Sequence, residues 1–212
     1  MSEDASRVPV RELILVPSIL TLGVTLLRLV GELQNWSPSL FNKTAGGGGA
    51  LVGISWLIPV FGCYFGWRLT KAGHGPASAG KVFGLALLVA LGVGGAAAAF
   101  ARVSQNAFFL ALTVGSIVGI VVSARLWPAL WKTLLAYAFA ARIPVALVML
   151  PAILGNWGTH YDVAPPDLRA MSPLARWLMI GVLPQMTFWI YLTVVGGMIV
   201  GAIAAAIAGK RR

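Results

Sequence analysis

The fold is decided by two uncharged apolar runs, VFGLALLVALGVGGAAAAFA at residues 82–101 and AFFLALTVGSIVGIVVSA at residues 107–124. A hydrocarbon layer about 30 Å thick is crossed by roughly 20 helical residues, because each residue rises about 1.5 Å. Both runs have that length, and the intervening RVSQN is long enough for a tight helical connection. The stretch therefore predicts two antiparallel transmembrane helices.

The composition of the whole chain also predicts a membrane protein. Of its 212 residues, 58% are hydrophobic and 10% are charged, whereas an ordinary soluble domain has about 45 to 50% and about 25%. The 16 basic and 6 acidic side chains are too few to solvate the surface of a soluble domain of this length. The net charge of +10 comes from basic residues scattered between apolar runs, so we expect no nucleic-acid partner.

Four further runs are long enough to cross a bilayer, so we predict an all-α bundle of about six transmembrane helices, forming a single membrane domain over residues 1–212. The last run is longer than one crossing requires. It is preceded by Ser172 and Pro173, which are typical of a helix N-cap and first turn. The expected spans are approximately 13–30, 50–69, 82–101, 107–124, 128–154 and 177–205.

The distribution of basic residues predicts the orientation, because cytoplasmic loops are enriched in Lys and Arg. Ten basic residues fall on one side and four on the other, so we expect both termini in the cytoplasm, in the cell membrane or, for a bacterium, the inner membrane. A five-span alternative, with the segment around Arg142 along the interface, would place the C-terminus outside. The cytoplasmic set is Arg7, Arg11, Arg68, Lys71, Lys81, Arg125, Lys132, Lys210, Arg211 and Arg212, and the external set is Lys43, Arg102, Arg169 and Arg176.

Arg142 is the most informative single residue, because a charge near the middle of a bilayer costs several kcal/mol unless it faces a cavity, a partner or the interface. It follows Lys132 by ten residues, which is roughly 15 Å of helix. Its neighbour Pro144 cannot donate a backbone hydrogen bond and leaves a carbonyl free near Ala140. Arg142 could brace the helix at that carbonyl, or it could line a cavity and bind a phosphate or carboxylate.

Two further residues are candidates for ligand binding beside Arg142, namely Arg28 and Tyr161. Arg28 lies near the outer end of the first span, with Glu32 four residues later on the same helical face. A local ion pair within reach of the lipid headgroups would explain both charges. Tyr161 belongs to the densest polar cluster of the chain, in the second long external loop.

The same loop contains His160 and Asp162, which could act as a base and its orienting carboxylate, or contribute to a metal site. A catalytic histidine also needs a nucleophile, and a metal needs further ligands. The alternative is an ordinary headgroup-level loop in which Asp162 makes local hydrogen bonds. The single cysteine, Cys63, lies in an apolar run, and no zinc-binding spacing is present. We therefore expect no metal and no cofactor.

Three pairs of glycines with a spacing of four allow close helix approach and predict packing seams. They favour packing within the bundle, and they also permit association of two copies of the chain. Besides such a second copy, the expected partner is the lipid bilayer, including its anionic lipids. The pairs are Gly62 with Gly66, Gly115 with Gly119, and Gly197 with Gly201.

Three functions are compatible with these features. The first is a small transporter, channel-like or lipid-handling protein whose cavity contains Arg142. The second is a non-catalytic assembly or interaction subunit, and the third is an enzyme that acts on lipid at the outer leaflet. No predicted span has Asp or Glu near its centre, which disfavours a proton-driven pump.

Overall fold

The computed structural model describes residues 8–47 and 49–209, and this part of the chain is helical, without strands. Five helical stretches are long and apolar enough to cross a membrane. The expected all-α fold with several membrane-compatible helices is confirmed. The five are α1 (Val10–Leu33), α3 (Ala79–Ala101), α4 (Gln105–Ser123), α5 (Pro128–Gly155) and the stretch Pro173–Gly209.

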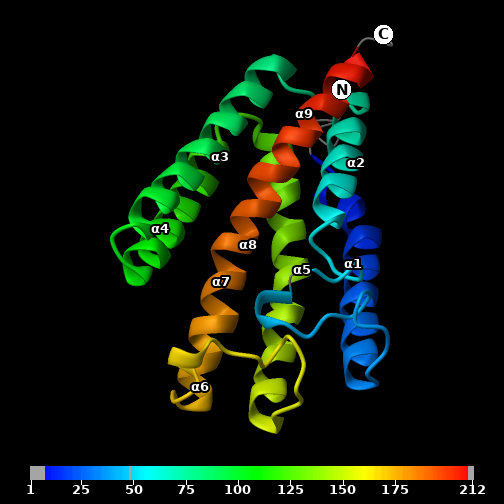
Figure 1. The fold of residues 1–212 in the computed structure, drawn as a ribbon. Helices are drawn as coiled ribbons and strands as arrows, with labels where there is room; N and C mark the ends of the chain where they lie inside the picture. The colour runs from blue at the N-terminus through cyan, green and yellow to red at the C-terminus, as the bar shows by residue number, and fades with distance from the viewer. Residues whose placement is uncertain (1–7, 48, 210–212) are drawn as a thin grey trace.

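The helices run alternately along the bundle, so that α1 begins at the end where the last helix, α9 (Gly197–Gly209), finishes (Figure 1). We call that end inner and the opposite end outer, following the predicted orientation. The side of the membrane that each end faces stays a prediction. Four of the basic residues behind it, Arg7, Lys210, Arg211 and Arg212, lie outside the described residues.

The second expected span differs from the others because only its second half is helical. Helix α2 covers Leu57–Lys71, 15 residues, and does not reach the length of a spanning helix. Residues 50–56 form bends and turns instead. The segment between α1 and α2 folds back beside the outer half of α1 and α5 (Figure 1). Irregular backbone is tolerated at membrane depth where it is covered by protein or lines a cavity.

The inner half of the bundle is closed by a glycine seam between α2 and α9. A methyl group on Gly66 would lie 2.6 Å from the Cα of Gly201, and one on Gly62 would lie 2.8 Å from the Cα of Gly197. The two backbones can approach this closely only because these residues have no side chain. Beside the seam, the Phe61, Phe65 and Tyr137 rings pack edge to face at 5.3 and 5.5 Å.

The remaining glycine pair also packs within the chain. A methyl group on Gly115 would lie 3.1 Å from Val93 of α3, and one on Gly119 would lie 2.7 Å from the Tyr191 ring. All three predicted pairs therefore contribute to contacts between helices of one chain. Association of two copies through these glycines stays a prediction.

The last helical stretch starts at Pro173, four residues earlier than expected, and it is irregular. The Ser172 hydroxyl accepts a bond of 3.4 Å from the Ala175 amide, which confirms the predicted N-cap. The stretch then alternates between α-helical and wider π-helical turns, and the backbone breaks at Thr187 (φ −116°, ψ −81°). Its segments are α6 (Pro173–Arg176), η4 (Trp177–Val182), α7 (Leu183–Met186), α8 (Phe188–Tyr191), η5 (Leu192–Gly196) and α9.

Pro184 explains part of this irregularity, because it supplies no N–H to the preceding turn. The Thr187 hydroxyl donates to the Leu183 carbonyl at 2.7 Å. Wider turns and breaks of this kind often occur at functional sites. Here they place Gln185 and Trp189 against the outer part of α5, where the candidate site lies.

We predict that Gly66→Ala destabilises the protein by about 1–3 kcal/mol, because the added methyl group collides with the Gly201 backbone. The melting temperature in detergent should fall by about 5 °C. Gly94→Ala is the matched control, since no atom lies within 4 Å of a methyl group there. An unchanged melting temperature for Gly66→Ala would contradict the seam.

Candidate functional site

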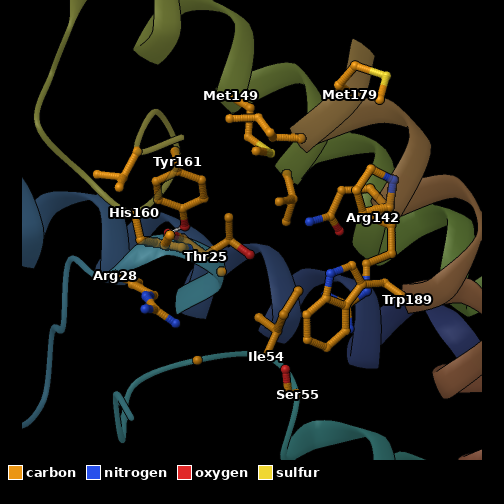
Figure 2. Close-up of a pocket in the computed structure, with 18 of the residues that line it drawn as sticks. Thr25, Arg28, Ile54, Ser55, Arg142, Met149, His160, Tyr161, Met179 and Trp189 are labelled. Carbon is orange, nitrogen blue, oxygen red and sulfur yellow. Dashed lines mark hydrogen bonds between the residues drawn. The ribbon is translucent and has the colours of Figure 1, made fainter. Parts of the chain in front are cut away.

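A cavity of about 300 Å³ lies in the outer half of the bundle (Figure 2). Its walls come from α1, α4, α5, the last helical stretch, the segment that precedes α2, and the loop that follows α5. Most of the lining is apolar. The polar or charged lining side chains, with Trp189, are Thr25, Arg28, Ser55, Arg142, His160, Tyr161 and Gln185.

Arg142 lies on the cavity side of α5, with Val145 and Met149 on the same helical face. The helix continues through Pro144 from Pro128 to Gly155 and passes through the core of the bundle, not along its end (Figure 1). By length and composition this helix could cross a membrane, and the number of spans stays a prediction. The Arg142 side chain is directed into the protein.

The Arg142 guanidinium is buried without a counter-charge. The residue is 3% exposed, and its Nε has no hydrogen-bond partner in the described part of the chain. The guanidinium lies against the Trp189 ring, whose centroid is 4.7 Å from Cζ. The bond to a free carbonyl near Ala140, which would brace the helix, is not formed. Of the two roles that the sequence left open, the geometry favours the cavity.

Arg28 and Glu32 form the predicted ion pair, with 2.8 Å between Nε and Oε1. The sequence suggested that this pair would be free to reach the lipid headgroups. In the structure both side chains are buried instead. Arg28 also donates from Nη2 to the Asn42 carbonyl at 2.9 Å. A methyl group on Gly53 would lie 3.1 Å from Arg28 Nη1, so a glycine there leaves room for the guanidinium. The segment after α1 thus covers the pair.

His160 joins the same network from the loop after α5. Its Nδ1 lies 2.6 Å from Glu32 Oε1, and its backbone amide donates to Glu32 Oε2 at 2.8 Å. Burial lowers the pKa of the His160 imidazole below its ordinary value of 6.5, although the bond to Glu32 acts in the opposite direction. Neutral His160 can donate from Nδ1 to the Glu32 carboxylate. The carboxylate that holds this ring is therefore Glu32, not Asp162.

Asp162 has a different role, because it shapes the loop. Its carboxylate accepts bonds from the Gly158 amide at 2.9 Å and from the Thr159 amide and hydroxyl at 2.7 Å each.

Tyr161 lines the cavity. It is buried and donates from its hydroxyl to the Thr25 carbonyl at 3.1 Å. Burial also raises the pKa of the Tyr161 phenol.

The structure thus brings together Arg142, Arg28, Tyr161 and His160 around one cavity and leaves Asp162 in the loop turn. Sequence reasoning missed Gln185 and Trp189. Gln185 is the only amide side chain in the uncharged stretch 177–209. That isolation was a usable signal, because a polar side chain inside a membrane span normally needs a partner.

Within residues 8–47 and 49–209, no group of three or more His, Cys, Asp or Glu side chains is placed to hold a metal ion. The chain matches no protein family, no curated protein and no solved structure.

The low pKa of His160 predicts a loss of stability on acidification. In the unfolded chain the imidazole takes up a proton near pH 6.5, whereas in the folded protein it does so only at lower pH. The unfolded state therefore binds more protons in this interval, and stability falls as the pH drops through it. The groups around the imidazole are Glu32 and Arg28 of α1 and Asp162 of its own loop.

We expect the melting temperature to fall between about pH 7.5 and about pH 5.5, and the fall to be smaller in His160→Asn. Asparagine keeps a donor for Glu32 and cannot titrate. His74→Asn is the control, because His74 does not line the cavity and its carbonyl accepts from Trp127 near the inner end. Equal pH profiles for wild type and His160→Asn would contradict the prediction.

Proposed function

We propose that this membrane-embedded protein binds an amphipathic anion, meaning a carboxylate or phosphate headgroup with an apolar tail, in the outer cavity. Arg142 would bind the anion, and the apolar walls would hold the start of the tail. The observation that carries the proposal is the buried Arg142 guanidinium, which faces the cavity without a carboxylate partner. A protein with this activity would be a lipid-handling or small transport protein.

The charges of the site support an anionic ligand. Glu32 neutralises Arg28, and burial favours the neutral form of His160. Arg142 therefore carries the uncompensated charge of the cavity. Burying a guanidinium without a counter-ion costs several kcal/mol, and a bound anion would offset that cost. Binding sites commonly retain destabilising groups of this kind because the ligand needs them.

The walls of the cavity support an amphipathic ligand. Phe109 and Met179 line the cavity, and they are also 48% and 44% exposed. Towards the outer end, the α3–α4 hairpin diverges from the last helix (Figure 1). An apolar tail could therefore leave the cavity sideways towards the hydrocarbon layer.

The packed inner half favours lipid handling over an open channel. The α2–α9 seam and the rings of Phe61, Phe65 and Tyr137 fill the region between the cavity and the inner end. A transporter would have to separate these elements during its cycle, whereas a lipid-binding protein would not.

The other two functions have less support. An assembly subunit would need exposed seams for its partners. The glycine pairs that could form such seams contact other helices of the same chain. An enzyme could use His160 with Glu32 as its orienting carboxylate. Within the described residues, however, no hydroxyl or thiol is hydrogen-bonded to the His160 ring as a nucleophile.

The proposal is tested with Arg142→Met, which keeps a long side chain without its charge. A long-chain fatty acid should raise the wild-type melting temperature by about 5 °C at saturation, whereas the matched fatty alcohol should not. Arg142→Met should lose the response to the acid. Without ligand, the variant should be at least as stable as wild type, because an uncompensated buried charge has been removed.

Arg102→Met is the matched control, since Arg102 lies in the α3–α4 turn and does not line the cavity. It should respond to the acid as wild type does. A lower ligand-free melting temperature of Arg142→Met with an intact response to the acid would support helix bracing and overturn the proposal.

A further inference from the structure

A second unpartnered polar group faces the same cavity. Gln185 is 8% exposed, and its side-chain oxygen Oε1 has no hydrogen-bond donor in the described part of the chain. The other buried unpartnered side-chain atoms there belong to Ser18, Ser116 and Arg176, and none of these residues lines the cavity. Among the residues that line the cavity, the buried side-chain atoms without a partner in the described part of the chain are therefore a donor, Arg142 Nε, and an acceptor, Gln185 Oε1.

The irregular last helix brings Gln185 to the cavity that Arg142 also lines. Gln185 and Trp189 are four residues apart and both face the cavity, and the Trp189 ring lies against the Arg142 guanidinium. Helix α5 packs against both α7 and α8. Arg142 and Gln185 nevertheless do not bond to each other in the structure. Their unused atoms are complementary to a molecule that carries an acceptor and a donor close together.

We infer that the ligand headgroup carries a hydrogen-bond donor, a hydroxyl or an amide N–H, beside its anionic group, and that Gln185 accepts from this donor. This inference rests on the proposed function, because it assumes that Arg142 binds the anion. The chemical class is a hydroxy acid or an N-acyl amino acid. The apolar walls and the exposed Phe109 and Met179 favour the long-chain, membrane-borne members of that class.

Selectivity should arise because an acid without a donor leaves the Gln185 oxygen desolvated and unpaired. A buried acceptor that loses its partner is costly, and sites built to hydrogen-bond a hydroxyl discriminate against analogues that lack it. A water molecule beside Gln185 would satisfy the oxygen equally well. In that case, acids with and without the donor would bind alike.

The experiment compares a long-chain fatty acid with its β-hydroxy derivative of the same length and with an N-acylglycine of matched length. Affinities are measured by calorimetric titration of the full chain in a neutral detergent. Wild type should bind at least one donor-bearing acid about fivefold more tightly than the plain acid. Gln185→Met should bind all three acids equally, and it should bind the plain acid at least as tightly as wild type does, because no acceptor is then left unpaired. Arg142→Met should bind none of them.

The outcomes separate the two proposals. If wild type binds the three acids equally and Arg142→Met binds none, the role of Gln185 is overturned and the proposed function stands. If Arg142→Met binds the plain acid as wild type does, the proposed function fails. If β-hydroxybutyrate binds as tightly as the long-chain hydroxy acid, the hydrogen bond to Gln185 is supported. The proposed membrane-borne ligand is then overturned in favour of a soluble hydroxy acid.

A second variant covers the case in which Gln185→Met does not fold. Gln185→Glu has nearly the same shape, and its carboxylate would pair with Arg142 and compete with the ligand anion. The affinity for all three acids should fall at least tenfold, while the melting temperature without ligand should stay the same or rise. Wild-type affinities in Gln185→Glu would show that this side chain does not share a site with Arg142.

Discussion

The Glu32 carboxylate is the interaction on which the outer half of the molecule depends. It is 0% exposed, and it accepts from the Arg28 guanidinium and from both the backbone amide and the ring of His160. Through Arg28 it also reaches the Asn42 carbonyl. One carboxylate thus joins the end of α1, the segment before α2 and the loop after α5. Without it, the cavity would lack its outer wall.

The same network leaves Arg142 as the group available to a ligand. A buried carboxylate is costly unless its oxygens are fully bonded, and Glu32 meets that condition with three donors. Arg142 has no such partner and lies against the Trp189 ring instead. Within the described residues, the cavity is therefore bordered by a neutralised charge network around Glu32 and lined by Arg142, a cation without a carboxylate partner. This asymmetry connects the architecture of the outer half with the proposed anion binding.

The two halves of the bundle differ in backbone chemistry. In the inner half, glycines of α2 and α9 bring two regular helices into close contact, so there is no room for a ligand. In the outer half, α2 is replaced by an irregular segment, and the last helix is widened by π-helical turns around Pro184. Irregular backbone in both walls keeps the helices apart and leaves space between them. The candidate site and the irregular backbone occur in the same region of the protein.

The amino-acid sequence by itself determined the all-helical class and the long apolar helices, and it identified Arg142 as a charge within an apolar run, because hydropathy and such a charge are local properties. It did not show that α2 begins at Leu57, because residues 50–56 are apolar enough for a span and only their bends exclude helix. Tertiary structure alone decided that Glu32 holds His160, 128 residues away, and that Gln185 lines the same cavity as Arg142. These pairings depend on how the helices pack and turn, which apolar periodicity does not encode.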